Sequence, residues 1–216
     1  SIEMSEEFYE RYWKLVDENP NLLYQRQYLN EFVKEYIKNN PKSDREEVYV
    51  IPVVFHVVHN YGEENISYEQ ILGAVEQMNK DYRKMRSDTA SIHPAFKGIA
   101  ADVKIEFRLA RIDPWGNCTI GVVRTASEAT SAGYEAAKEA SPTWPPDKYL
   151  NIWTVKVLGH GAAGWSYYPG TAPDGSDGII LLHNYVGVSG TSNNGHGSVL
   201  THEAGHYLNL PHTWGN

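Results

Sequence analysis

Cysteine is nearly absent from this 216-residue sequence, which holds only Cys118. No disulfide can therefore close within the chain: either it folds without one, or Cys118 pairs with a residue outside these 216. Apolar runs of the roughly 20 residues that a membrane helix needs are also absent. Basic residues are outnumbered, with 19 Lys and Arg against 27 Asp and Glu, which argues against a nucleic acid or an anionic membrane as a partner. The rest of the composition, 41% hydrophobic and 21% charged, is ordinary for a globular protein.

Glycine is missing from residues 1–46, where apolar side chains recur at helical spacing. A first helix is expected over about Ser5–Glu18, and a second begins after Asn19-Pro20, a pair typical of a helix start. The second helix carries an apolar stripe: Leu29, Phe32, Val33, Tyr36 and Ile37. The polar segment Pro41–Glu47 follows as a linker. Residues 1–46 are interpreted either as a helical hairpin packed on the domain or as a removable pro-segment.

From Val48 onwards the pattern changes to alternating strands and helices. Ser67-Tyr68-Glu69-Gln70 is a capping box, which predicts a helix that places Ile71, Val75, Met78 and Tyr82 on one face. Strands are predicted over residues 48–58, 103–112, 119–125, 149–158, 162–168 and 178–182. This order predicts an α/β (α+β) domain over residues 47–216, with a twisted mixed sheet and helices packed against it.

The residues that carry chemistry lie near the C-terminus. His202 and His206 are four residues apart, so a helix places both imidazoles on one face, where they can bind one metal ion. Glu203 lies about 100° around the same helix from His202. It can therefore lie beside the metal without being a ligand, which is the position that a general base requires.

A third histidine, His212, reaches the same metal only if the helix ends before it. Asn209 lies where such an ending is needed, and asparagine tolerates a left-handed backbone conformation. Pro211 forbids regular continuation of the helix. The helix is therefore expected to end near Leu208 or Asn209. Three neutral histidines that leave a fourth position open are typical of a catalytic zinc site rather than a structural one.

The whole motif, His202 to His212, resembles the zinc motif of the metzincin endopeptidases, most of which have glycine where Asn209 stands. Asparagine at that position, the aromatic Tyr207 and the following Thr213-Trp214-Gly215 are similar to the pappalysin family. The resemblance covers most of the chain and includes four further segments: Ile51–Val58, Tyr149–Trp153, Ala163–Trp165 and Asp177–Ile180.

Resemblance to the pappalysins implies a secreted zinc endopeptidase that acts on proteins or peptides. His202, His206 and His212 would bind Zn²⁺, and Glu203 would polarise the zinc-bound water. The bacterial, ulilysin-like members favour Arg or Lys just after the cut, and their pro-segment resembles the helical N-terminus of this chain. With that preference, Asp44–Arg45 is the best site for self-cleavage in the linker. Ca²⁺ is expected from the resemblance alone.

Residues 162–168 resemble the strand at the upper rim of the family's cleft. Main-chain groups of Ala163, Gly164, Trp165 and Tyr167 are then predicted to bind an extended peptide substrate as an added strand. The alternative is an ordinary edge strand with exposed aromatic side chains.

The family's methionine turn follows the third histidine, whereas Met4, Met78 and Met85 all precede the motif. We therefore expect a catalytic domain truncated after the third zinc histidine, with a C-terminal remainder of the same protein as partner. A catalytically silent binding module and an incomplete fragment are the alternatives to an active enzyme. His56 is interpreted as a core histidine with satisfied hydrogen bonds.

Overall fold

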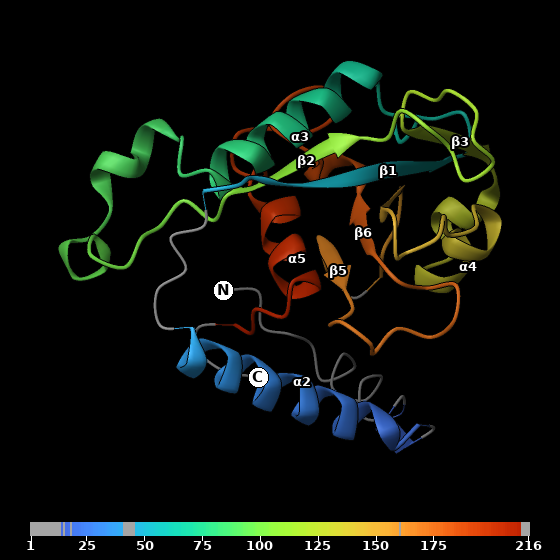
Figure 1. Ribbon diagram of the computed structural model, residues 1–216. Helices are drawn as coiled ribbons and strands as arrows, with labels where there is room; N and C mark the ends of the chain where they lie inside the picture. The colour runs from blue at the N-terminus through green and yellow to red at the C-terminus, as the bar shows by residue number, and fades with distance from the viewer. Residues whose placement is uncertain (1–13, 15, 18, 41–45, 160, 213–216) are drawn as a thin grey trace.

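The computed structural model describes residues 14, 16–17, 19–40, 46–159 and 161–212. Most of the first predicted helix, Ser5–Glu18, lies outside the described residues, as does most of the linker Pro41–Glu47. The described chain forms a sheet with helices on both faces, and helix α2 (Asn21–Asn39) lies along one side of it (Figure 1).

The sheet is centred on β1 (Tyr49–His59). On one side β1 pairs in parallel with β4 (Leu150–Val155), and β4 pairs in parallel with β6 (Ile179–Leu182). The short strand β5 (Gly164–Ser166) pairs antiparallel with β6 and forms the edge of the sheet. The mixed sheet predicted from the sequence is therefore confirmed.

The other side of β1 is shared by two strands. β2 (Ile105–Leu109) pairs in parallel with residues 49–53 of β1, and β3 (Val122–Ala126) pairs in parallel with residues 55–59. The sequence predicted longer strands, 103–112 and 119–125, separated by a turn. Instead, the chain leaves the edge of β1 after β2 and returns to the same edge as β3.

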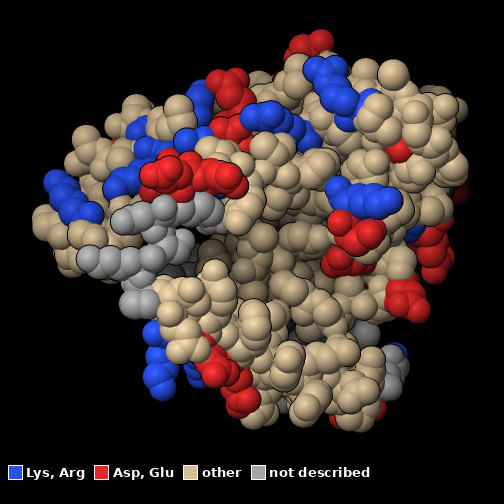
Figure 2. All heavy atoms as spheres, in the orientation of Figure 1, with Lys and Arg blue, Asp and Glu red and all other residues tan. Residues whose placement is uncertain are grey.

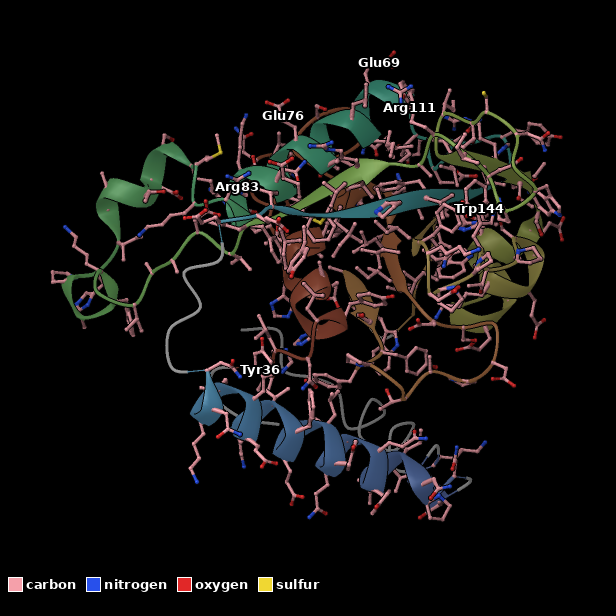
Figure 3. All side chains as sticks on the ribbon, viewed as in Figure 1. Tyr36, Glu69, Glu76, Arg83, Arg111 and Trp144 are labelled. Atoms are coloured by element: carbon pink, nitrogen blue, oxygen red, sulfur yellow. The ribbon has the colours of Figure 1, made fainter. Side chains whose placement is uncertain are left out.

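Helices cover the two faces of the sheet. α3 (Tyr68–Tyr82) and α5 (Val199–Tyr207) pack on one face, and α4 (Tyr134–Ala140), which the sequence did not predict, packs on the other. Figure 3 shows Glu69 and Glu76 on the outer side of α3, away from the sheet. The described 3₁₀ helices are η1 (Ser87–Ser91), η2 (Pro94–Phe96), η3 (Glu128–Ser131) and η4 (His183–Tyr185).

His56 is a core histidine, as predicted. It is fully buried in β1 and stacks on Trp153, with ring centroids 4.9 Å apart. Its Nδ1 lies 3.0 Å from Ser141 Oγ and its Nε2 lies 3.0 Å from Asn151 Oδ1. Because Asn151 Oδ1 can only accept, His56 Nε2 donates this hydrogen bond. Burial lowers the pKa of His56 to about 4, so the ring is neutral near pH 7.

The apolar stripe predicted on α2 faces away from the core. Phe32 is 55% exposed and Ile37 is 62% exposed, whereas Leu22, near the start of the helix, is the buried residue of α2. The stripe of α2 is therefore largely exposed, and the helical hairpin stays a prediction, because most of its first helix lies outside the described residues. Figure 2 shows a face whose middle is mostly uncharged, with acidic and basic side chains gathered around it. No helix within the described ranges is both long and apolar enough to cross a membrane.

Candidate active site

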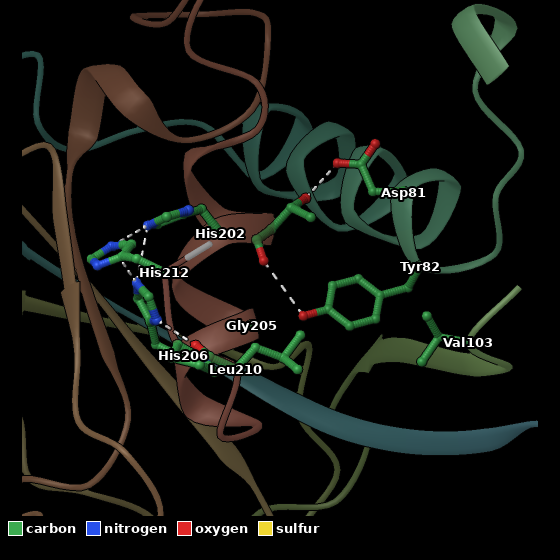
Figure 4. Close-up of a pocket in the computed structure, with 10 residues that line it drawn as sticks. Asp81, Tyr82, Val103, His202, Gly205, His206, Leu210 and His212 are labelled. Atoms are coloured by element: carbon green, nitrogen blue, oxygen red, sulfur yellow. Dashed lines mark hydrogen bonds between the residues drawn. The ribbon is translucent and has the colours of Figure 1, made fainter. Parts of the chain in front are cut away.

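The three motif histidines converge on one point. His202 and His206 lie one turn apart on α5, and their Nε2 atoms are 3.0 Å apart. His212 Nε2 lies 3.1 Å from His206 Nε2 and 3.3 Å from His202 Nε2 (Figure 4). Among the described residues, this is the one group of three or more His, Cys, Asp or Glu whose ligand atoms come together.

The end of α5 brings His212 back to the helix. The last helical residue is Tyr207, and Asn209 has the positive φ, 71°, that the sequence predicted for the turn. Leu210 N donates to Gly205 O at 2.9 Å, which closes the turn. Leu210 O then accepts a hydrogen bond from His206 Nδ1 at 2.8 Å. Since a carbonyl can only accept, His206 carries its proton on Nδ1 and points the lone pair of Nε2 at the other two histidines.

The charge state of the histidines suits a metal site. Burial, together with the nearby His202, His212 and Arg26, lowers the pKa of His206 to about 4, against the hydrogen bond to Leu210 O, which raises it. Partial burial also lowers the pKa of His202 and of His212. All three imidazoles are therefore neutral near pH 7, which is the form that binds metal.

The triangle of nitrogen atoms fits a tetrahedral zinc ion. Zn–N bonds of about 2.0–2.1 Å at tetrahedral angles place two ligand nitrogens about 3.4 Å apart. The three separations here are 3.0, 3.1 and 3.3 Å. Three lone pairs this close repel one another unless a cation lies among them, so the donor set itself fits a metal ion.

Glu203 projects from α5 to the underside of β5. Its side chain packs against Gly164, and burial raises the pKa of its carboxyl group to about 8. A divalent cation close to the carboxylate would favour the ionised form and lower this pKa again. Glu203 is thus a carboxylate whose proton affinity depends on what binds at the adjacent histidines.

The predicted substrate strand forms the edge of the sheet, but its aromatic side chains point to the sheet face that α4 covers. Tyr167 is 4% exposed, and its hydroxyl donates to Glu135 Oε1 of α4 at 3.1 Å. Trp165 packs against the core beneath α4. Ala163 is buried, and its carbonyl accepts from Leu182 N of β6. The exposed aromatics of the alternative are therefore not observed, whereas substrate binding by this edge strand stays a prediction in which main-chain groups are what β5 offers.

A hollow of about 390 Å³ extends from the histidines towards the C-terminal end of α3 (Figure 4). Asp81 lies in its wall, where it accepts a short hydrogen bond from Thr201 Oγ1 and forms an ion pair with Arg86 at 3.2 Å. Arg86 also donates to Ser198 Oγ at the start of α5. No pattern in the sequence indicated this network, which ties the start of α5, just before His202, to the C-terminal end of α3 and to Arg86.

Gln70 is a second residue whose role the sequence did not reveal. Ser67 Oγ caps α3 by accepting from Gln70 N, as the capping box predicted. The Gln70 side chain, however, turns away from the cap: its Nε2 donates to His183 O and Val186 O, and its Oε1 accepts from Thr191 N. Gln70 therefore anchors the connection that leads from β6 to α5.

Helix α2 contacts the same site from outside the domain. The Arg26 guanidinium lies 4.1 Å from the ring centroid of Tyr168, which itself makes an edge contact with His206 at 5.5 Å. Asn209 Nδ2 donates to Asn30 Oδ1 at 3.2 Å. One face of α2 thus lies against the residues that surround the histidines.

Comparisons with known proteins agree with this geometry. A family model described as "Pregnancy-associated plasma protein-A" matches residues 133–216. The chain is 34% identical to mature mirolysin of Tannerella forsythia, solved with a cleaved peptide, with a TM-score of 0.72 over 79% of this chain and 67% of that one. It is 31% identical to a promirolysin mutant of the same organism, with a TM-score of 0.74 over 93% of this chain and 67% of that one.

Curated relatives are also metalloproteases. An extracellular metalloprotease of Podospora anserina is 33% identical over 39% of this chain and 30% of its own length. Another, of Arthroderma gypseum, is 25% identical over 84% of this chain and 55% of its own length. The chain thus spans about half or less of the curated relatives that it matches.

A mixed sheet with an antiparallel edge strand, beside a helix that carries convergent histidines, defines a catalytic domain of the metzincin type. Within that class, the chain belongs to the pappalysin family of metalloproteases.

Proposed function

We propose that the protein is a zinc-dependent endopeptidase. The convergence of His202, His206 and His212, with Nε2 atoms within 3.3 Å of one another and Glu203 on the same helix, carries this proposal. A zinc ion held by these nitrogens supplies a Lewis acid and lowers the pKa of water. Membership of a metalloprotease family supports the same assignment.

Glu203 is the proposed general base. Its carboxylate accepts a proton from the attacking water and passes that proton to the departing amine. Burial raises the pKa of this carboxyl group, and a zinc ion at the adjacent histidines would lower it again, so that the ionised form that accepts the proton would be present in the metal-bound protein. The histidines, whose lone pairs are committed to the metal, do not exchange protons in this scheme.

Proteins and peptides are the proposed substrates, bound in extended form along the free edge of β5. Of the four predicted residues, Gly164 has its main-chain groups on the free edge and would provide the added pairing. Hydrogen bonds alternate along an antiparallel strand, so Ala163, whose carbonyl accepts from Leu182 N, and Trp165 face β6 instead. The mirolysin complex with a cleaved peptide supports the substrate class. A preference for Arg or Lys after the cut is proposed from family resemblance.

We also propose that the protein is secreted and that it is made as an inactive precursor. The curated relatives are named extracellular, which supports a secreted protein. Residues 1–46 are the proposed pro-segment and residues 47–216 the catalytic domain. The contacts of α2 with Tyr168 and Asn209 support this division, as does the larger share of the chain that matches promirolysin. A C-terminal remainder of the same protein as partner stays a prediction from family resemblance. Ca²⁺ remains a prediction from resemblance.

The first test combines metal analysis with digestion of a protein substrate. We expect one zinc ion per chain and hydrolysis that a chelator abolishes. Glu203→Ala should keep the zinc, because Glu203 is not a ligand, and lose about 10²–10⁴-fold in kcat. Loss of zinc from this variant would contradict the assigned role of Glu203. Zinc without hydrolysis in the unaltered, processed protein would favour a silent binding module.

A further inference from the structure

Gly164 is the point at which the substrate strand and the general base touch. It opens β5, opposite Leu181 of β6. A Cβ atom added at Gly164 would lie 2.9 Å from Glu203 Cγ and 3.2 Å from Glu203 Oε1. It would also lie 2.5 Å from Leu181 Cδ2. The Glu203 side chain therefore occupies the volume that any other residue at position 164 would fill.

The Glu203 side chain lies close against Gly164. Among the residues that the structure describes, none donates a hydrogen bond to its carboxylate, although Glu203 is only 7% exposed. Side chains without hydrogen bonds take their position from van der Waals contacts alone. For Glu203, those contacts include the backbone of the edge strand at Gly164.

The backbone at Gly164 gives no other reason for glycine. Ten glycines of the described chain have a positive φ, and Gly164 is not among them. Any residue could adopt its conformation, so the requirement at this position is one of space. Glycine at position 164 is therefore explained by its neighbours, Glu203 and Leu181, rather than by a turn.

We propose that Gly164 is a positioning residue for the general base: its missing side chain sets where the Glu203 carboxylate lies relative to the metal and the substrate. This inference rests on the proposed function, in which Glu203 is the base. It makes the rim strand part of the catalytic geometry as well as the surface along which a peptide binds. A displacement of about 1 Å at a reacting group can lower a rate by about 10²-fold.

Gly164→Ala in the full-length protein tests the proposal. We expect unchanged zinc content and affinity, a kcat lowered by about 10²-fold, and a KM within about threefold of the original. Gly98→Ala is the matched control and should keep its kcat, because a Cβ added there meets nothing within 4 Å and the residue does not have a positive φ. A rise in KM alone would show that Gly164 acts through substrate binding. Loss of zinc would show that it supports the metal site. Either result would overturn the proposal.

Two more variants separate Glu203 from Leu181 and from misfolding. Gly164→Ala with Leu181→Val removes the Cδ2 atom that the new methyl group meets at 2.5 Å, yet leaves the contact with Glu203. It should fold and should still show the lowered kcat; recovery of the original kcat would assign the effect to Leu181. In the Glu203→Ala background, Gly164→Ala should cause no further loss, since the residue through which it acts is gone.

A structural measurement keeps the inference distinct from the proposed function. Crystal structures of zinc-free protein, with and without Gly164→Ala, should show the Glu203 carboxylate displaced and the three imidazoles in place. If the unaltered protein binds zinc without hydrolysing peptides, the proposed function fails, but this displacement still decides whether Gly164 positions Glu203. A carboxylate that stays in place would refute the inference even in an active enzyme.

Discussion

At the scale of single residues, the convergence of the three histidines depends on how one helix ends. Asn209, with its left-handed backbone, turns the chain so that His212 meets His202 and His206. We expect His212→Ala to lower zinc affinity by about 100-fold or more and to lower activity with it, because only the two helical ligands remain. Equilibrium competition with a zinc-sensitive dye measures the affinity.

Asn209→Gly is the matched control for that experiment. Glycine keeps the left-handed turn without the side chain, so zinc affinity should stay close to that of the original protein. Unchanged zinc affinity in His212→Ala would show that His212 is not the third ligand.

Residue-scale prediction succeeded where the relevant contacts are local. The spacing of His202, His206 and His212 and the helix end at Asn209 follow from rules that span about one helical turn. The sequence could not show that Gln70 would reach residues 183–191, because that contact joins segments more than 110 residues apart. For the same reason, it could not place Tyr167 behind the sheet, where Glu135 accepts its hydrogen bond.

At the scale of secondary structure elements, α2 is the part whose removal should change activity. Arg26 of α2 lies over Tyr168, and a cation–π contact of this kind contributes about 0.5–2 kcal/mol. Arg26→Ala should therefore raise the basal activity of the uncleaved protein by about 2- to 30-fold, measured on a short fluorogenic peptide. Lys38→Ala, in the exposed last turn of the same helix, should leave that activity unchanged. Equal activity in the Arg26→Ala variant and the original protein would show that this contact does not maintain latency.

Cleavage at Asp44–Arg45 should release α2 altogether and give the larger increase. N-terminal sequencing after incubation with zinc locates the cut, which lies outside the described residues. A cut that persists in Glu203→Ala, in a preparation free of other proteases, would argue against self-processing. A new N-terminus inside β1 would argue against the linker as the site.

Element boundaries show the limits of the sequence patterns. The apolar run that forms β1 was predicted to within one residue at each end, because residues 53–59 of this central strand are buried on both faces. The strands beside it were predicted too long, and the pattern did not show that β2 and β3 share one edge of β1. Contacts between distant segments decide which strands pair, and local periodicity carries no information about those contacts.

At the scale of the whole molecule, acid stability should depend on the buried His56. Burial lowers its pKa from the usual 6.5 to about 4. Between these values the unfolded chain binds a proton that folded His56 does not, so the free energy of unfolding falls as the pH is lowered from about 6.5 to 4. His56 contributes on the order of 3 kcal/mol to this fall.

Urea unfolding of zinc-free protein at several pH values measures the effect. His56→Gln should reduce the pH dependence in this window, whatever its stability at neutral pH, whereas His93→Gln, at an exposed position, should preserve it. An identical pH dependence in His56→Gln and the original protein would mean that His56 takes up its proton equally in both states.

The central position of β1 has a consequence for biosynthesis. Its parallel neighbour β4 begins roughly 90 residues after β1 ends. At about 5–20 residues per second, a ribosome needs about 5–20 s to make the intervening chain. Throughout that interval an eleven-residue apolar strand has no partner on one of its edges, which makes the nascent chain a client for chaperones that shield apolar segments.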